Sequence, residues 1–206
     1  MTYPININVK DYGAKGDGTT CDYTFIKNAV TAINSAGSGT LVFPPGIYLI
    51  DKYKITGGPK ANLITDIIYQ NCTGLSIIGY RATVVVKGDF HRDADNASGK
   101  ISYSESVVPF SFVNCSNFEL RGFELTGSVN VMTRDAAVVE GNCHGIKTSN
   151  CSDYTLQNLY VHHFAADGIL LGLSSTTADK RAHITSVKSL GGFNRLWRHS
   201  APRSAH

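Results

Sequence analysis

Two short segments carry residue types that could transfer protons, and the segments share a Gly-Ile pair. One reads Asp167-Gly168-Ile169, and the other reads His144-Gly145-Ile146-Lys147. If both segments occupy the same place on successive turns of a repeat, His144 neighbours Asp167 and Lys147 lies just along the strand. A carboxylate, an imidazole and an ammonium group brought together could act as acid or base and balance the charge of a substrate.

More ionisable residues flank these segments. Arg134 and Asp135 precede His144, and His162 and His163 precede Asp167. Side chains alternate between the two faces of a strand, so we expect at most one of the two histidines on the substrate side. The candidate catalytic residues are therefore Asp167, Asp135 and His144, and the candidate substrate-binding residues are Arg134, Lys147 and His163.

A repeated element has to position these segments. Asn followed by Cys and then Ser or Thr begins at Asn71, Asn114 and Asn150, and a fainter copy without Asn-Cys begins at Ala182. Apolar residues alternate with others after each copy, which indicates a strand. Asn suits a sharp bend because it tolerates the left-handed conformation. Units of about 20 to 50 residues are typical of solenoids, so the repeat predicts stacked strands joined by bends, a parallel β-helix.

The cysteines of the repeat, Cys72, Cys115 and Cys151, are expected to stack as small buried side chains. The chain has five cysteines, and this odd number argues against a disulfide framework. A reduced ladder is therefore favoured. Oxidation stays open, because neighbouring turns lie about 4.8 Å apart, within reach of a disulfide. No Cys or His spacing predicts zinc, and we expect no metal site.

A helix is predicted near the N-terminus, at about residues 22–36. Asp22 stands in the N-cap position ahead of apolar residues at helical spacing, and Ala36-Gly37 ends the segment. Laid across the first turn, this helix would cap the open end of a solenoid. The Gly-rich loop before it lacks the lysine of a phosphate-binding loop, so a tight turn with close backbone packing is expected.

The N-terminal segments resemble those of a known superfamily. Residues 11–18 read Asp-Tyr-Gly-Ala-Lys-Gly-Asp-Gly, and residues 39–48 read Gly-Thr-Leu-Val-Phe-Pro-Pro-Gly-Ile-Tyr. With the helix between them, they resemble the N-terminal signature of the pectate-lyase-like superfamily, and more narrowly its glycosyl hydrolase family 28-related branch, which includes phage tailspikes. The Asn-Cys repeats are similar to the turns of that family over most of the remaining chain. The resemblance implies an all-β, right-handed parallel β-helix and a polysaccharide substrate, and it leaves the chemistry open.

Hydrolysis and elimination both remain compatible with the resemblance. Glycoside hydrolysis uses two carboxyl groups that flank the bond. A lyase acting on uronates uses a base and a group that neutralises the carboxylate, often calcium. Asp167-Gly168-Ile169 is similar to the Asp-Gly-Ile portion of the Asn-Thr-Asp-Gly motif of family 28 polygalacturonases, with Ala165 and Ala166 in place of Asn and Thr. The later paired Asp-Asp, Gly-His-Gly and Arg-Ile-Lys motifs of that family are absent.

We therefore expect an enzyme acting on an acidic, pectin-like polysaccharide, with a glycoside hydrolase favoured over a lyase. No cofactor is expected, apart from Ca²⁺ if the protein is a lyase. The alternative is a non-catalytic carbohydrate-binding or structural β-helix, such as a phage tailspike fragment. Charged residues make up 17% of the 206 residues, and the net charge of +3 is spread along the chain, so no nucleic acid partner is expected.

One β-helix domain is expected at residues 1–192. Residues 193–206 lack a period of two and are interpreted as an atypical tail, vector-derived or out of frame. The chain is interpreted as truncated, and enzyme activity is expected of the full-length protein. An unfinished solenoid exposes an edge, so homo-oligomers are expected, as trimers or through that edge. There is no secretory signal and no apolar run that could span a membrane, and a role outside the cell or in a virion remains compatible.

Overall fold

The computed structural model describes residues 5–51, 66–87, 108–127, 144–164, 167–172, 179–190 and 196–198. Their elements in chain order are β1 (Asn6–Asn8), the 3-10 turn η1 (Val9–Tyr12), β2 (Asp17–Cys21), α1 (Tyr23–Ala36), β3 (Gly39–Val42), β4 (Gly46–Ile50), β5 (Ile68–Gln70), β6 (Leu75–Val86), β7 (Phe110–Val113), β8 (Ser116–Thr126), β9 (Ile146–Ser149), β10 (Ser152–His162), β11 (Ile169–Leu171), β12 (Lys180–Leu190) and β13 (Leu196–Arg198).

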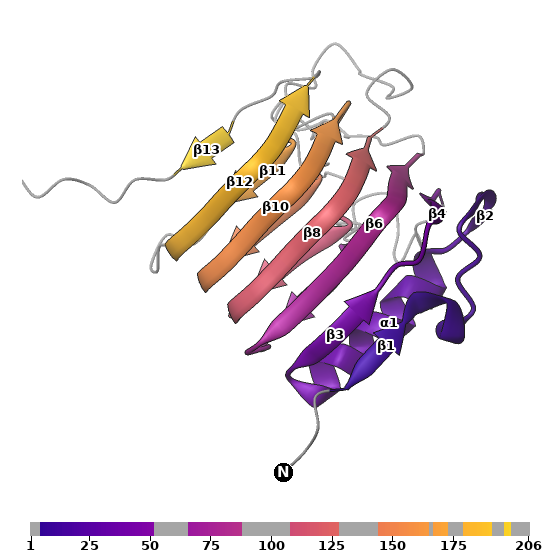
Figure 1. The fold of residues 1–206 in the computed structure, drawn as a ribbon, viewed down its shortest axis with the longest axis horizontal. Coiled ribbons are helices and arrows are strands. Elements are labelled where there is room, and N and C mark those ends of the chain that lie inside the picture. Colours follow the sequence, from indigo (N-terminus) through magenta and orange to yellow (C-terminus); the bar gives the residue numbers. More distant parts are fainter. Residues whose placement is uncertain are drawn as a thin grey trace, which may run out of the picture.

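The strands form two sheets whose described pairings are all parallel. The larger sheet has the order β1-β3-β6-β8-β10-β12, with β4 pairing with both β2 and β6, and the smaller sheet has the order β5-β7-β9-β11-β13 (Figure 1). From β5 onward the chain alternates between the two sheets, strand by strand. This alternation is consistent with the predicted parallel β-helix.

Left-handed residues mark the bends between the strands. Asn71, Asn114 and Asn150 have φ values of 55°, 53° and 54°, which confirms the bend predicted for each repeat. Their side chains form a ladder, in which Asn114 Nδ2 donates to Asn71 Oδ1 at 3.3 Å and Asn150 Nδ2 donates to Asn114 Oδ1 at 2.8 Å. The amides therefore link successive turns as well as allowing each bend.

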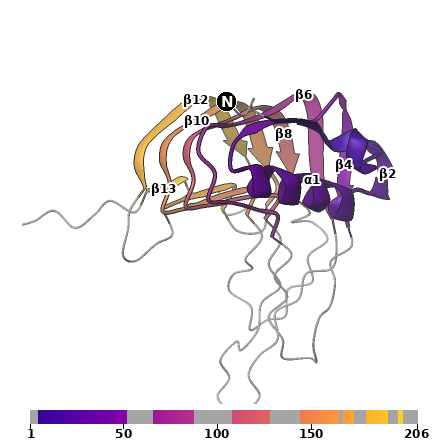
Figure 2. The same cartoon turned by 90° about the horizontal axis from the view of Figure 1, so that it is seen from below.

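A second column of left-handed residues bends the long strands of the larger sheet partway along their length. Gly122, Asn158 and Ser186 are neighbours in register, and Arg81 lies beside Gly122 at an irregularity in the pairing of β6 with β8. Seen from below, the larger sheet bends over the layer that contains the smaller sheet and α1 (Figure 2). The two sheets thereby enclose the core.

The core between the sheets is built from stacked side chains of the same kind. Cys72, Cys115 and Cys151 are buried free thiols, which agrees with the predicted reduced ladder. The Phe118 ring stacks on Tyr154, with 4.8 Å between the ring centroids, and also on a phenylalanine of β7. Such pairs stabilise the stack beyond the burial of their area.

Helix α1 confirms the predicted segment and closes one edge of the smaller sheet. It begins after Asp22 and ends at Gly37, whose φ is 72°. The Asn34 side chain donates to the carbonyl oxygen of Ile68 at 2.7 Å and accepts from the backbone N–H of Gln70 at 3.0 Å. The amide therefore satisfies backbone groups of β5 that a neighbouring strand would otherwise satisfy.

The side chain of Asp22 has a different role from the one its position suggests. It makes no capping hydrogen bond to the helix. The buried carboxylate instead accepts from the backbone N–H groups of Lys15 at 2.6 Å and Gly16 at 3.0 Å. A Cβ atom on Gly46 would lie 2.6 Å from the Gly16 carbonyl oxygen, so the predicted close backbone packing of this loop is confirmed.

The smaller sheet extends into the segment that the sequence sets apart as a tail. Strand β13, at residues 196–198, pairs in parallel with β11, so the sheet continues past the predicted boundary at residue 192. Ala182, Ile184 and Val187 of β12 are partly buried against the core, as the fainter fourth copy of the repeat predicts.

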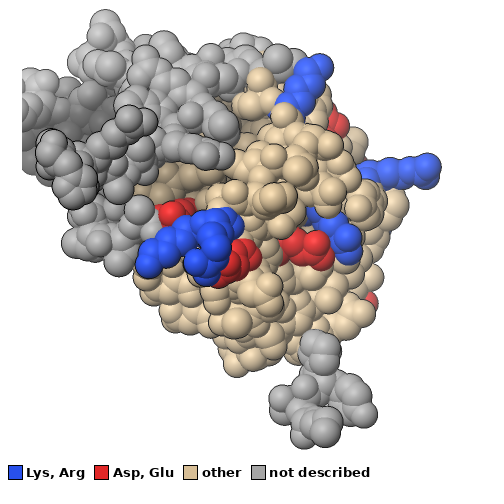
Figure 3. All heavy atoms as spheres, turned by 60° about the vertical axis from the view of Figure 1, so that its left-hand side comes forward, with Lys and Arg blue, Asp and Glu red and all other residues tan. Residues whose placement is uncertain are grey.

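Charges on the described surface are mixed in sign. Basic and acidic side chains lie beside one another on the face shown in Figure 3. Arg181 pairs with Asp153, and Arg121 lies 3.5 Å from Glu119. The helical residues that the structure describes include no segment with the length and apolar character needed to cross a membrane.

Candidate functional site

The predicted pair of Asp167 and His144 lies where two strands of the smaller sheet begin. Ile169 of β11 is paired with Ile146 of β9, and this register sets residue 167 beside residue 144. His144 Nδ1 accepts a hydrogen bond from the backbone N–H of Asp167 at 3.2 Å, and it lies 3.8 Å from the carboxylate oxygen Oδ2. The predicted proximity of the two residues is confirmed.

His144 is a neutral hydrogen-bond donor in this setting. Burial and the charge of Lys147 lower its pKa from 6.5 to about 4. Since Nδ1 accepts from the backbone of Asp167, the network assigns the ring proton to Nε2. The contact between Nδ1 and the Asp167 carboxylate is therefore not an ion pair at neutral pH. The lone pair of Nδ1 is already engaged, and Nε2 carries the proton.

Lys147 is held by a carboxylate that the sequence did not suggest. Its Nζ atom lies 3.8 Å from Oδ2 of Asp66, whose side chain is only 4% exposed. Asp66 precedes β5, and β7 lies between β5 and β9, so the lysine side chain crosses one strand. The position of Asp66 within the repeat could have indicated that it lies near His144 and Lys147. Asp66 precedes Asn71 by the same number of residues as Gly145 precedes Asn150 (71 − 66 = 150 − 145).

The other predicted residues do not all meet at this edge. Asp135 and Arg134 lie outside the described residues. His163 follows the end of β10 in the larger sheet, where it belongs to a different group of polar side chains. Within the described ranges, no three or more His, Cys, Asp or Glu side chains are arranged to hold a metal ion.

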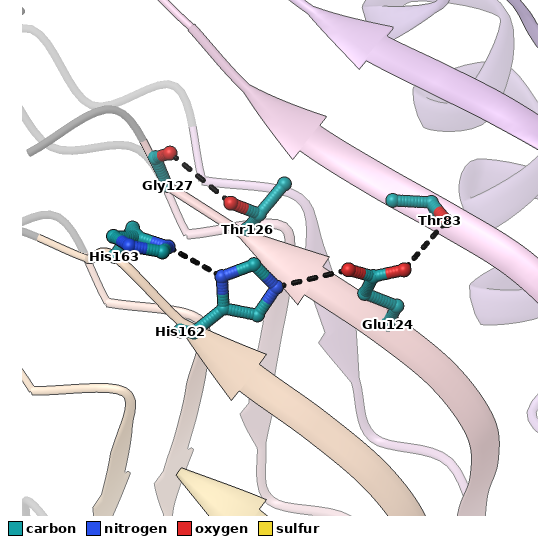
Figure 4. Close-up of polar contacts among 6 residues, drawn as sticks. All are labelled: Thr83, Glu124, Thr126, Gly127, His162 and His163. Atoms are coloured by element: carbon teal, nitrogen blue, oxygen red, sulfur yellow. Dashed lines mark hydrogen bonds and ion pairs between the residues drawn. The ribbon is translucent and has the colours of Figure 1, made fainter. Parts of the chain in front are cut away.

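Figure 4 shows the chain of contacts around His163. Thr83 Oγ1 donates to Glu124 Oε2 at 3.2 Å, and Glu124 Oε1 lies 3.0 Å from His162 Nε2. His162 Nδ1 in turn contacts His163 Nδ1. The Tyr160 ring stacks on the His162 ring with centroids 4.2 Å apart. Neither Glu124 nor the contact between the histidines was anticipated from the sequence.

The strict alternation of side chains along β10 does not extend to His163. Strand β10 ends at His162, and His163 has a left-handed backbone with φ of 57°. The alternation of side chains holds only while the backbone stays extended. The change of conformation brings the two imidazoles together at the end of the strand.

Comparison with known proteins identifies relatives that modify polysaccharides. Over 127 residues the chain is 32% identical to mannuronan C5-epimerase AlgE6 of Azotobacter vinelandii, covering 60% of this chain and 13% of that protein. Over 124 residues it is 44% identical to AlgE4 of the same organism, covering 60% and 20%. It is also 46% identical over 58 residues to alginate lyase 7 of A. vinelandii, covering 28% and 6%. The chain thus spans a fifth or less of the length of these relatives.

Solved structures share the fold. The A-module of A. vinelandii mannuronan C-5 epimerase AlgE4 superposes with a TM-score of 0.53 at 18% identity, covering 94% of this chain and 51% of that one. ORF18 of Geobacillus virus E2 gives a TM-score of 0.55 at 19% identity, covering 81% and 28%. The family described as rhamnogalacturonase A/epimerase, pectate lyase-like, matches residues 6–191. The resemblance stated from the sequence is confirmed, and the chain belongs to this family.

Proposed function

We propose that the chain forms a right-handed parallel β-helix and that it acts on an acidic polysaccharide by moving the proton at C5 of its uronate residues. One observation carries this proposal: a neutral imidazole N–H, a lysine ammonium and a carboxylate occupy one edge of the smaller sheet. The epimerases and the lyase to which the chain is similar support the substrate class, since mannuronan and alginate are polymers of uronates.

Charge stabilisation is the central requirement of this chemistry. Removing the proton at C5 leaves negative charge that spreads onto the neighbouring carboxylate. Lys147 and the Nε2–H group of His144 would stabilise that charge. A neutral imidazole suits this role, because it polarises the substrate oxygen without giving up its proton completely. Asp66 would hold Lys147 in place through the contact at 3.8 Å.

Asp167 is proposed as one proton-transfer group. Its side chain is 20% exposed and lies beside His144, so a substrate bound to His144 would also meet this carboxylate. If a proton returns to the opposite face of C5, the product is the epimer. If the bond from C4 to its oxygen breaks instead, the product carries an unsaturated sugar. Both outcomes require a second proton-transfer group.

Hydrolysis, the reaction favoured from the sequence, remains the second candidate. Asp66 favours it, because this residue adds a second carboxylate at the same edge as Asp167. Most glycosidases use two catalytic carboxyl groups that flank the scissile bond. However, Asp66 is nearly buried and contacts Lys147, which fits a positioning role better than protonation of a leaving group.

A panel of mannuronan, polygalacturonate and a neutral glucan, incubated with the protein in D₂O, separates these reactions. Deuterium at C5 of the inverted sugar with the chain length unchanged indicates epimerisation, ultraviolet-absorbing ends indicate a lyase, and new reducing ends alone indicate a hydrolase. We expect deuterium at C5, and Asp167→Asn should abolish it. Asp153→Asn, which alters a surface ion pair, is the matched control. Binding without any reaction would overturn the proposal of an enzyme.

A further inference from the structure

The hydrogen bonds at the end of β10 fix the positions of the ring protons. The ionised carboxylate of Glu124 can only accept, so His162 Nε2, at 3.0 Å from Oε1, must carry a proton. A neutral His162 then has a bare Nδ1, and the contact between the two Nδ1 atoms requires His163 to donate from its own Nδ1. The chain of donors therefore runs from His163 through His162 to Glu124.

With its proton on Nδ1, the neutral His163 ring carries no proton on Nε2. His163 is exposed, whereas the His162 side chain is only 11% exposed. In the neutral state, His163 Nε2 carries a lone pair and can take up a proton. His144 has the opposite arrangement, with the lone pair occupied and Nε2 protonated. His144 can thus donate a hydrogen bond from Nε2, and neutral His163 can accept one at Nε2.

The backbone at His163 is held in place by the neighbouring strand. The N–H group of Gly127, at the end of β8, donates to the carbonyl oxygen of His162 at 2.9 Å. A Cβ atom on Gly127 would lie 2.5 Å from the carbonyl oxygen of His163, so only glycine allows this approach. His163 is four residues from Asp167, and the two Cα atoms can be at most about 14 Å apart.

We propose that His163 is the second proton-transfer group of the reaction, with Glu124 and His162 as positioning residues that fix its tautomer. The proposal rests on the proposed function at C5. When Asp167 accepts the C5 proton on one face of the sugar, protonated His163 returns a proton from Nε2 to the other face. One C–H bond breaks and one forms, the electron pair resides meanwhile on the substrate carboxylate, and exchange with water restores both groups.

The tautomers can be tested without any substrate. In long-range ¹H–¹⁵N spectra of the full chain, we expect the Nδ1–H form of His163 and the Nε2–H form of His162. Glu124→Gln should convert His163 to a mixture of tautomers, because an amide both donates and accepts. Glu119→Gln is the matched control, since Glu119 lies on the same strand and contacts Ser76 and Arg121 instead. An Nε2–H form of His163 in the wild type, or an unchanged tautomer in Glu124→Gln, would overturn the positioning role.

Deuterium exchange at C5 of mannuronan tests the catalytic role. His163→Gln should slow the formation of the deuterated C5 epimer at least about a hundredfold, the usual contribution of a general acid or base. Glu124→Gln should slow it less, and Glu119→Gln should leave it unchanged. If the wild type forms the C5 epimer and His163→Gln does so equally fast, the assignment of His163 fails and the proposed function stands. If the wild type exchanges none, the proposed function fails and the role of His163 fails with it.

Discussion

Acidification provides a quantitative test of the environment of His144. Its pKa is about 4 in the folded protein, against an ordinary value of 6.5. The unfolded chain therefore binds more protons than the folded protein between these two values, and stability falls as the pH drops through this window. Above the ordinary value His144 is neutral in both states and contributes no pH dependence.

The size of the effect follows from the two pKa values. The complete difference corresponds to about 3 kcal/mol of unfolding free energy, reached only below the folded pKa. Between pH 7 and pH 5, His144 should account for about 2 kcal/mol of lost stability. The cause is physical: protonation places a positive charge in a buried position beside the ammonium group of Lys147.

Urea unfolding of the wild type and of His144→Gln at pH 7 and pH 5 measures this contribution. Glutamine cannot titrate in this range, so the variant should lose about 2 kcal/mol less than the wild type over the interval. His183→Gln is the control, because His183 is exposed on β12. Equal losses in the wild type and in His144→Gln would refute the reasoning about the buried imidazole.

Three further substitutions test the fold by urea unfolding at pH 7. Asp22→Ala removes two hydrogen bonds to a buried carboxylate and should cost about 3 kcal/mol or more, whereas Asp17→Ala at the exposed start of β2 should cost less; equal effects would contradict the role of burial. Asn114→Ala should cost about 1–2 kcal/mol through the left-handed backbone, and Asn114→Gly should restore part of it; no difference between them would contradict backbone strain. Gly79→Ala would place a Cβ 2.2 Å from the Phe123 ring and should cost about 1–3 kcal/mol; unchanged stability would show that the ring moves freely.

Local rules explain why the scaffold could be predicted from the sequence. The bend at Asn114 depends on one residue that tolerates a left-handed backbone. The strands depend on a period of two, and α1 on helical spacing of apolar residues. The repeat then sets the register, which is why the placement of His144 beside Asp167 could be predicted.

Longer-range contacts explain what could not be predicted. Asp22 occupies an N-cap position, but the backbone of the preceding loop competes successfully for its carboxylate. The alternation of His162 and His163 fails because a single left-handed residue ends the strand. Glu124 reaches His162 only through the pairing of β8 with β10, and no local pattern marks that contact.

The amide of Asn34 has a consequence for how the molecule meets other chains. An exposed edge strand has unpaired backbone N–H and C=O groups, which can pair with a strand of another protein and so begin aggregation. At β5, Asn34 already occupies the carbonyl of Ile68 and the N–H of Gln70, so an incoming strand finds these groups taken. The Asn34 side chain thus blocks the pairing of a further strand with β5. Extension of the smaller sheet at this side would first require α1 to detach.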